Sequence, residues 1–389
     1  MQLTKITVNN FKSLVDFELS LDKFNCLIGL NGAGKTTVLQ AVDFLGQLFW
    51  GDIAGWLARR QWEASDLNSR LIRKSNLQFS VHWTHNDRRC HWRGNFNRSQ
   101  LRCTNEVLED LETESELMRV EGGELYLDGD TKGRSLDFEY QGSVVSQLKN
   151  NILPESLQQL KHFTDELRSL ELLAPHLLRR RARSGEGSVG AGGERLSAFI
   201  HELSPDQKGS LKHLLRRCYP QLQGIETHAL RAGWKQLEIK ECYGKHRLSS
   251  EARHVNDGML RLMAILAEIL GNAEFLLFDE IENGINPELI EFLLDHLVGA
   301  RQQILVTTHS PMILNYLDDE VARRGVRYLY RTPEGYTRAV PFFKIPSMAE
   351  KLKVMGPGEA FVDTELSRLP EEIARWQAEL NETGDVSTG

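Results

Sequence analysis

Residues 29–36 have the types and spacing of a phosphate-binding loop. They run Gly-Leu-Asn-Gly-Ala-Gly-Lys-Thr, which fits the pattern G-x-x-x-x-G-K-[ST]. The glycines allow successive backbone N–H groups to face a phosphate chain, and the helix expected to follow points its positive end at the same anion. We expect Lys35 to reach the β- and γ-phosphates and Thr36 to offer its hydroxyl to Mg²⁺. The alternative is a chance glycine-rich turn, but its place between a strand and a helix favours a phosphate loop.

Two acids follow an apolar stretch at 275–280, which runs FLLFDE. Buried carboxylates are costly unless they coordinate a metal or pair with another group. We predict that Asp279 holds the Mg²⁺ shell through water, and that Glu280 orients and polarises an attacking water. The alternative is that both acids cap the next helix.

A histidine follows a third apolar stretch, in Thr307-Thr308-His309-Ser310-Pro311. A lone histidine is more often structural. Because the phosphate loop and the paired acids precede it in order, we predict that His309 senses and stabilises the γ-phosphate.

The elements that must position these groups are strands alternating with helices. Apolar strands are expected at 24–29, 275–279 and 303–308, and helices at 35–49, 258–271 and 287–299. This alternation predicts a buried parallel sheet with helices on both faces. Further strands are expected at 2–9, 15–21 and about 225–242, with a hairpin over 76–95. Segment 143–217 is predicted to be mainly helical around a flexible loop at 185–193.

The composition is that of a globular protein. The 389 residues are 41% hydrophobic and carry 47 Lys+Arg against 54 Asp+Glu, a net charge of −7. We expect two or three lobes. No apolar run reaches the ~20 residues of a membrane span, and the N-terminus lacks the layout of a secretory signal. The five cysteines are scattered, as expected of reduced thiols. We therefore expect a cytoplasmic protein that does not bind membranes.

The charge is unevenly distributed. Residues 59–102 hold ten Lys/Arg against three Asp/Glu, while 359–389 hold two against eight. The basic stretch also contains Trp62, Trp83 and Trp92, which is compatible with nucleic-acid contact. The alternative, a sheet with a solvated charged face, is the stronger interpretation. A second basic cluster at 179–183 would grip phosphate, nucleic acid or an acidic partner, or else form a solvated helix end.

A zinc site is not predicted. The candidate ligands do not have the spacing of a compact Cys/His site, and several would point to opposite faces of a hairpin. They are His82, His85, Cys90, His91 and Cys103.

Several ordered motifs together resemble a known family. They are Asn10–Leu14, the loop at 29–36, Val255–Arg261, residues 275–287 and residues 307–311. The chain resembles ABC-type ATPases of the SMC and DNA-repair branch. It is most similar to stand-alone AAA family ATPases of bacterial anti-phage defence, including overcoming-lysogenization-defect (OLD) systems. The resemblance implies an α/β P-loop NTPase of ABC type, with a mixed central sheet between helices, an antiparallel β subdomain and a short helical insertion.

The resemblance also implies residue roles. ATP would be bound by the loop residues Asn31, Gly32, Ala33, Gly34, Lys35, Thr36 and Thr37, and by Asn10 and Lys12. Thr36 and Asp279 would hold Mg²⁺, and Lys35, Glu280 and His309 would be catalytic. Asn256, Asp257 and Gly258 resemble the signature that closes on the phosphate of a partner protomer, with Asn256 in the usual serine position. An N-capped core helix at 256 is compatible with that contact.

The predicted organisation has four parts. An N-terminal ATPase lobe covers 1–142, a helical insertion 143–224, a C-terminal ATPase lobe 225–316, and an appendage with an acidic tail 317–389. Only 78 residues follow Pro311, too few for the Toprim nuclease of OLD proteins.

The expected function is Mg²⁺-dependent ATP hydrolysis in a head-to-tail homodimer, or a higher homo-oligomer, with ATP between the protomers. Such a protein would sense a trigger in a defence or DNA-transaction complex and control a separate effector, a nuclease or toxin. The alternatives are a slowly hydrolysing scaffold that cages a partner and, with less support, a transporter ATPase subunit.

Overall fold

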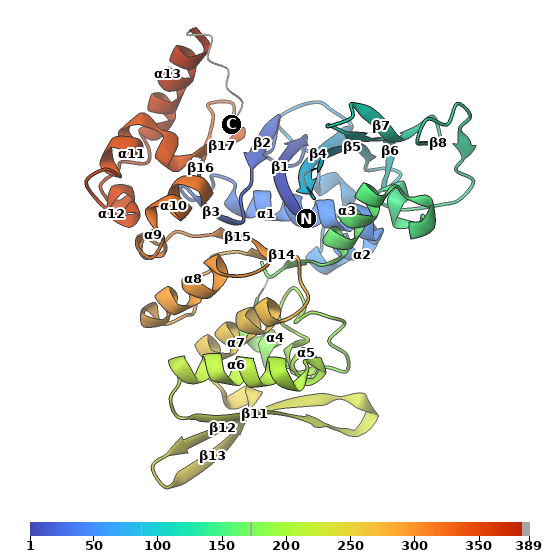
Figure 1. Cartoon of the computed structure of the whole chain (residues 1–389). Coiled ribbons are helices and arrows are strands. Elements are labelled where there is room, and N and C mark those ends of the chain that lie inside the picture. The colour runs from blue at the N-terminus through green and yellow to red at the C-terminus, as the bar shows by residue number, and fades with distance from the viewer. Residues whose placement is uncertain (87, 172, 383–389) are drawn as a thin grey trace. The chain divides into compact units, whose positions relative to one another are not determined.

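The computed structural model describes residues 1–86, 88–171 and 173–382 (Figure 1). The chain divides into two compact units. Unit 1 contains residues 1–165 and the residues from 317 onward, and unit 2 contains residues 166–316. Segment 143–224, predicted as one helical insertion, is thus divided between the units after Asp165. The segment after 316, predicted as an appendage, is part of unit 1.

Unit 1 contains an eight-stranded antiparallel sheet with the order β2-β1-β4-β5-β6-β7-β8-β9. Its strands are β1 (Gln2–Asn9), β2 (Phe17–Ser20), β4 (Asn76–His85), β5 (Arg88–Asn97), β6 (Arg102–Asp110), β7 (Ser115–Glu121), β8 (Glu124–Leu127) and β9 (Arg134–Ser135). The strands predicted at 2–9 and 15–21 and the predicted hairpin are confirmed, and the first two strands pair with each other. The strands after β5 were not predicted, because β6 turns two acids, Glu106 and Asp110, toward the buried side and so breaks the apolar alternation.

Helix α1 (Lys35–Trp50) covers one face of this sheet (Figure 1). Phe44 packs against Phe96 with ring centroids 5.2 Å apart, and Phe49 packs against Trp92 at 4.8 Å. Alternate residues of the strands therefore form the core of unit 1, as expected for an antiparallel sheet covered on one side. Helices α2 (Ile53–Arg60) and α3 (Glu155–Asp165) flank α1.

The second group of strands in unit 1 joins distant parts of the sequence. The fully buried β3 (Phe24–Ile28) pairs in parallel with β16 (Val326–Arg331), which pairs antiparallel with β17 (Thr337–Pro341). The helices of this C-terminal segment are α10 (Asp319–Gly325), α11 (Pro346–Lys351), α12 (Pro357–Val362) and α13 (Leu369–Glu382). Of these, α10 contacts both β3 and β16. The C-terminal segment therefore supplies a buried strand next to the one that leads into the phosphate loop.

Unit 2 contains three parallel strands in the order β10-β14-β15: β10 (Leu167–Ser169), β14 (Phe275–Phe278) and β15 (Gln303–Thr307). The predicted strands near 275 and 303 are confirmed, and β10 interrupts the segment predicted as mainly helical. The helices of unit 2 are α4 (Pro175–Leu178), α5 (Leu196–Glu202), α6 (Pro205–Cys218), α7 (Asp257–Leu270), α8 (Ile290–Val298) and α9 (Pro311–Asn315).

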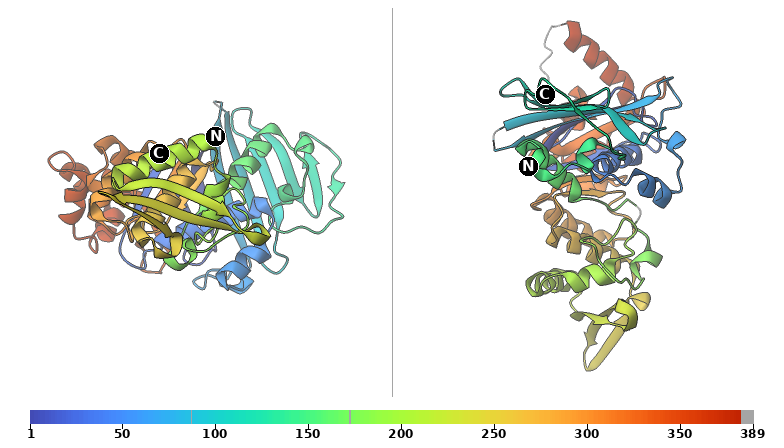
Figure 2. Two further views of the ribbon diagram at one scale, coloured as in Figure 1. Left: turned by 90° about the horizontal axis from the view of Figure 1, so that it is seen from below. Right: turned by 90° about the vertical axis from the view of Figure 1, so that its right-hand side faces the viewer.

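A three-stranded antiparallel sheet completes unit 2 (Figure 2). It consists of β11 (Leu222–Ala229), β12 (Lys235–Tyr243) and β13 (His246–Glu251), and it packs on α5 and α6. Short 3₁₀ turns connect elements throughout the chain, at Ala64–Asp66, Val144–Ser146, Asn150–Ile152, Arg231–Gly233, Ala252–His254, Pro287–Leu289 and Phe342–Lys344. Among the described residues, none of the helices combines the length and apolar character needed to cross a bilayer.

Candidate nucleotide site

The phosphate loop lies in unit 1 between the end of β3 and the start of α1. Gly29, Gly32 and Gly34 have φ angles of 148°, 77° and 108°, a region that residues with a Cβ rarely adopt. A Cβ on Gly29 would also lie 2.3 Å from the carbonyl oxygen of Leu329 in β16. The curl of the loop therefore depends on glycine at these positions.

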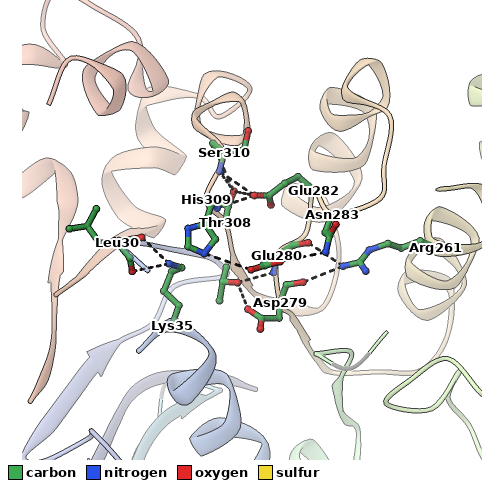
Figure 3. Close-up of polar contacts among 12 residues, drawn as sticks. Leu30, Lys35, Arg261, Asp279, Glu280, Glu282, Asn283, Thr308, His309 and Ser310 are labelled. Carbon is green, nitrogen blue, oxygen red and sulfur yellow. Dashed lines mark hydrogen bonds and ion pairs between the residues drawn. The ribbon is translucent and has the colours of Figure 1, made fainter. Parts of the chain in front are cut away.

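Lys35 is the first residue of α1 and is only 5% exposed. Its Nζ donates hydrogen bonds to the carbonyl oxygens of Gly29, at 2.8 Å, and Leu30, at 3.4 Å (Figure 3). The ammonium group is thus held over the loop. Of the other loop residues predicted to bind nucleotide, Asn31, Gly32 and Thr36 are exposed, Gly34 and Thr37 are half-buried, and Ala33 is buried.

The C-terminal hairpin of β16 and β17 holds the back of this loop. The buried Thr337 hydroxyl donates to the carbonyl oxygen of Ala33 at 3.0 Å, so Ser13 must donate to Thr337 Oγ1 at 2.9 Å. Arg331 Nε donates to the carbonyl oxygen of Gly32 at 2.9 Å. Burial lowers the pKa of the Arg331 guanidinium. Sequence reasoning missed Arg331 and Thr337, because no motif marks them.

A cavity of about 530 Å³ opens beside the loop. Its lining includes Lys12, Trp62, Arg70, Leu71 and Arg331. Lys12 Nζ lies 3.2 Å from the centroid of the Trp62 ring and donates to Gln40 Oε1 at 2.9 Å. The cavity thus combines cationic groups with one aromatic wall, and its volume is in the usual range for small-ligand sites.

Asn10, which was predicted to lie near the nucleotide with Lys12, is fully buried behind this cavity. Its Nδ2 donates to the carbonyl oxygens of Lys74 and Asn76, both at 2.9 Å, and its Oδ1 accepts from Ser69 N at 3.2 Å. Because these bonds occupy both ends of the amide, the role of Asn10 is to hold the chain around residues 69–76. Of the two residues predicted here, only Lys12 lines the cavity.

The paired acids lie in unit 2 directly after β14, and the neighbouring strand β15 fixes their positions. The Thr307 hydroxyl donates to Asp279 Oδ1 at 2.5 Å and accepts from the backbone N–H of Glu280 at 2.9 Å. Glu280 has a left-handed φ of 45°, which is uncommon for a residue with a side chain. The Glu280 side chain is 49% exposed, so its carboxylate is accessible to a ligand.

His309 lies beside Glu280. Its Nε2 is 3.7 Å from Glu280 Oε1, and 37% of its side chain is exposed (Figure 3). The loop that carries His309 is held by Glu282, whose Oε1 accepts from Thr308 Oγ1, His309 N and Ser310 N at 2.9, 2.9 and 3.1 Å. This bracing by Glu282 was not predicted; an acid just after the paired carboxylates was the only signal for it in the sequence.

The signature residues lie at the start of α7, also in unit 2. Asn256 caps the helix, since its Oδ1 accepts from Met259 N at 2.8 Å. Asp257 forms an ion pair with Arg179. A Cβ on Gly258 would lie 2.9 Å from the carbonyl oxygen of Gly284, so the helix start packs directly on the loop after the paired acids.

Arg261 in α7 links the signature helix to the paired acids. Its Nη2 donates to the carbonyl oxygens of Asp279, at 3.3 Å, and Glu280, at 3.1 Å. Burial lowers the pKa of Arg261, and the charges of Glu280, Glu282 and Asp279 oppose that shift. In unit 2, contacts through Arg261 and Glu280 therefore link the signature helix to the paired acids and His309.

The basic stretch 59–102 is part of the fold of unit 1, where several of its arginines pair with acids and two of its tryptophans are buried. Arg60 is buried in an ion pair with Asp43 at 2.7 Å, while Arg89 pairs with Glu112 at 2.6 Å. Trp83 and Trp92 are 1% and 0% exposed. These contacts are those of a folded sheet with paired surface charges, which favours the structural interpretation of this stretch.

Two family models match the chain. Residues 1–78 match the "AAA ATPase domain" and residues 162–315 match the "AAA domain, putative AbiEii toxin, Type IV TA system". The first matched segment ends soon after the phosphate loop and α2, and the second contains the signature, the paired acids and His309. The two matched ATPase-domain segments therefore contain the phosphate loop, the signature, the paired acids and His309.

Curated relatives and solved structures agree with this assignment. The DNA replication and repair protein RecF of Haemophilus ducreyi is 48% identical over 85 residues, 21% of this chain and 23% of that protein. RecF of Salmonella paratyphi B is 38% identical over 74 residues, 18% of this chain and 21% of that protein. The match thus spans less than a quarter of these relatives.

The fold is that of an SMC head. A crystal structure of an SMC head bound to the C-winged helix domain of ScpA matches 87% of this chain and 97% of that chain, with a TM-score of 0.53 and 14% identity. The predicted fold class is confirmed: a P-loop ATPase fold with a mixed parallel sheet, helices and an additional antiparallel sheet.

Proposed function

We propose that this chain hydrolyses ATP with Mg²⁺, with the phosphate loop binding the triphosphate and the acids after β14 activating the attacking water. The β- and γ-phosphates would lie on the loop N–H groups and Lys35, with the helix dipole of α1 adding to the attraction. The base and ribose would occupy the cavity beside the loop, where Trp62 offers a flat apolar wall and Lys12 and Arg331 offer donors.

The observation that carries this proposal is the contact between Glu280 and His309. An accessible carboxylate within 3.7 Å of an imidazole, directly after a buried strand, can orient a water and receive its proton. His309 would donate to the γ-phosphate while limiting the freedom of the Glu280 side chain. Catalysis of phosphoryl transfer then depends mainly on positioning and electrostatics.

The oxygen donors present fit Mg²⁺. Thr36 offers a hydroxyl at the start of α1, and Asp279 offers a carboxylate held in place by Thr307. Mg²⁺ prefers such hard oxygen ligands and retains part of its water shell. Bound there, it would neutralise charge on the phosphates.

We further propose that two copies associate head to tail around ATP. The signature residues support this arrangement, because Asn256 and Asp257 are exposed at the N-terminal end of a 14-residue helix. That end attracts anions. The N-cap keeps the helix start in place, so Asn256 could offer its side-chain amide to the phosphate of a second copy.

The biological role that we propose is nucleotide-dependent regulation of a separate effector in a bacterial defence or DNA-transaction complex. The matched family description that includes a toxin and the RecF relatives named for DNA replication and repair support this role. The effector would be a nuclease or a toxin that the ATP-bound assembly holds or releases.

The test compares wild type with Glu280→Gln. Wild type should turn ATP over, and Glu280→Gln should bind ATP, lose turnover by at least about a hundredfold and shift by light scattering from 44.4 kDa to twice that mass. The matched control is Glu288→Gln, because Glu288 is an exposed acid of the same loop region. Equal turnover by wild type and Glu280→Gln would favour an ATP-binding scaffold instead. A Glu280→Gln protein that stays monomeric with ATP would contradict the dimer.

A further inference from the structure

A small cationic cavity of about 220 Å³ lies in unit 2. Arg179, Arg180, Arg181 and Arg253 line it together with a single acid, Glu251. Four arginines line the cavity against one glutamate, and because Arg179 also pairs with Asp257, two positive charges remain in excess at this surface. Like charges held this close repel one another, so an anion in the cavity would be stabilised.

The cavity is assembled from three segments. The loop at 179–183 is attached to the start of β12, because Lys235 N donates to the carbonyl oxygen of Ala182 at 2.7 Å. Arg253 comes from the 3₁₀ turn Ala252–His254, which follows β13. The strand register of the small sheet therefore brings Arg253 to the same surface as the arginines of the 179–183 loop.

The acid in the cavity is shared. Glu251 Oε2 lies 3.4 Å from Arg181 Nη2 and 3.2 Å from Arg253 Nε. One carboxylate thus serves two guanidinium groups, and the exposed Arg180 has no ion pair among the described residues. The protein's own acids therefore do not neutralise this cavity. In the basic stretch 59–102 of unit 1, by contrast, surface arginines such as Arg89 have their own acidic partners.

The cavity is directly connected to the signature. Arg179 Nη2 contacts Asp257 and donates to the carbonyl oxygen of Val255 at 2.9 Å. Arg179 Nε is buried and has no acceptor among the described residues, so part of its hydrogen-bonding capacity is unused. Leaving such a buried donor unpaired is unfavourable. An added acceptor in the cavity would therefore compete with Asp257 for this guanidinium.

We propose that this cavity binds the phosphates of a nucleic-acid backbone and that Arg179 relays its occupancy to the signature. Guanidinium groups match phosphate in a two-pronged geometry. An aromatic neighbour favours nucleic acid over an acidic protein: Trp234 is 38% exposed and lies under Arg183, whose Cζ is 4.9 Å from the ring centroid. Exposed aromatic rings beside arginines stack on bases.

The first test measures binding to the full chain without nucleotide, by fluorescence anisotropy. The probes are a 20-base-pair DNA duplex and an RNA hairpin of equal charge, and they show which nucleic acid supplies the phosphates. Arg180→Ala with Arg253→Ala should weaken binding at least tenfold and lower the salt slope by about 2. The matched control is Arg216→Ala, which removes an exposed arginine of α6. Circular dichroism and the unfolding midpoint would verify that each variant is folded.

Wild type that binds neither probe, or a double variant that binds like wild type, would overturn the proposal. Arginine-dependent binding of poly-glutamate without binding of either nucleic acid would assign the cavity to an acidic protein instead.

The relay rests on the proposed ATPase function and needs its own measurement. Nucleic acid should change ATP turnover of wild type, and Arg179→Lys, measured at probe concentrations that saturate both proteins, should lose at least half of that change. Equal responses of Arg179→Lys and wild type would overturn the relay alone. Because binding is measured without nucleotide, an absence of ATP turnover in wild type would contradict the proposed function without affecting the binding result.

Discussion

The two halves of the nucleotide machinery are built in different ways. In unit 1 the loop presents backbone N–H groups, and its key side chain, Lys35, is 5% exposed. In unit 2 the key side chains are accessible: Glu280 and His309 are 49% and 37% exposed and are held through hydrogen bonds to Thr307 and Glu282. Binding a phosphate chain requires preorganised donors, whereas activating a water requires an accessible acceptor. The difference in burial fits these two tasks, which we propose for the two halves.

The halves also differ in how the chain assembles them. The unit 2 half comes from one continuous stretch, from the signature at Asn256 to Ser310. The unit 1 half combines the N-terminal segment with Arg331 and Thr337, about 300 positions later. Local motifs can therefore describe the unit 2 half, but they describe only part of the unit 1 half.

The largest effect that separates the halves is expected from Lys35→Ala. Removing this ammonium group should weaken ATP binding roughly a thousandfold, since an uncompensated phosphate charge would remain on the loop. Glu280→Gln should leave binding within a few-fold of wild type and remove turnover. Isothermal titration with a non-hydrolysable ATP analogue measures both affinities. Equal losses of affinity in the two variants would break the distinction between a binding half and a hydrolysing half.

The parts of the fold and site that could be predicted are those whose pattern is local. Strands β3, β14 and β15 are continuous apolar runs, and each is followed by its motif, so both element and motif were identified together. The partners of those strands were harder to predict. Strand β16 was not predicted because its role as the neighbour of β3 depends on a pairing across about 300 residues, and nothing in its local composition indicates that pairing.

Charge was the least predictable property. The basic stretch 59–102 and the cluster 179–183 look alike as lists of residues, but strand register gives them different surroundings. In the first, Arg93 lies opposite Val107 of β6 and pairs with Glu109, two residues further along that strand, at 3.1 Å. In the second, Arg181 shares Glu251 with Arg253. Net charge in a sequence window therefore does not indicate which cations remain available.

A smaller effect, on stability, should appear in unit 1. Glu106 is fully buried in β6, and burial raises its pKa to about 7 despite hydrogen bonds from Ser143, Val144 and Trp92. Because this folded-state pKa lies above the ordinary value of 4.5, the free energy of unfolding should fall as pH rises from about 4.5 to 7 and then level off. The loss should be roughly 3 kcal/mol.

Hydrogen exchange can assign this pH dependence to one unit. Between pH 5 and pH 8, amides of β5 and β6 should lose protection after correction for the intrinsic rate, while amides of β12 and β13 should change less. Glu106→Gln should remove most of the pH dependence in β5 and β6, whereas Glu116→Gln, an exposed acid on β7, should retain it. An unchanged slope in Glu106→Gln would show that another group causes it.

The smallest effect concerns the C-terminal hairpin that holds the phosphate loop. Thr337→Val keeps the volume of the side chain but removes the hydroxyl, which leaves the Ala33 carbonyl and the Ser13 hydroxyl without this partner. The free energy of unfolding of unit 1 should fall by about 1–2 kcal/mol. ATP affinity should fall about threefold to tenfold, because the loop would no longer be held in its binding geometry before ATP arrives.

Thr337→Ser is the matched variant, because it retains the hydroxyl while losing a methyl group, and its ATP affinity should remain within twofold of wild type. Titration calorimetry and urea unfolding of both variants distinguish packing from hydrogen bonding. If Thr337→Val loses stability but binds ATP as wild type does, the hairpin supports the fold without preorganising the loop. If affinity falls as expected, phosphate binding in unit 1 depends on residues about 300 positions apart. The acids of unit 2, by contrast, are positioned by residues of the same stretch, 256–310.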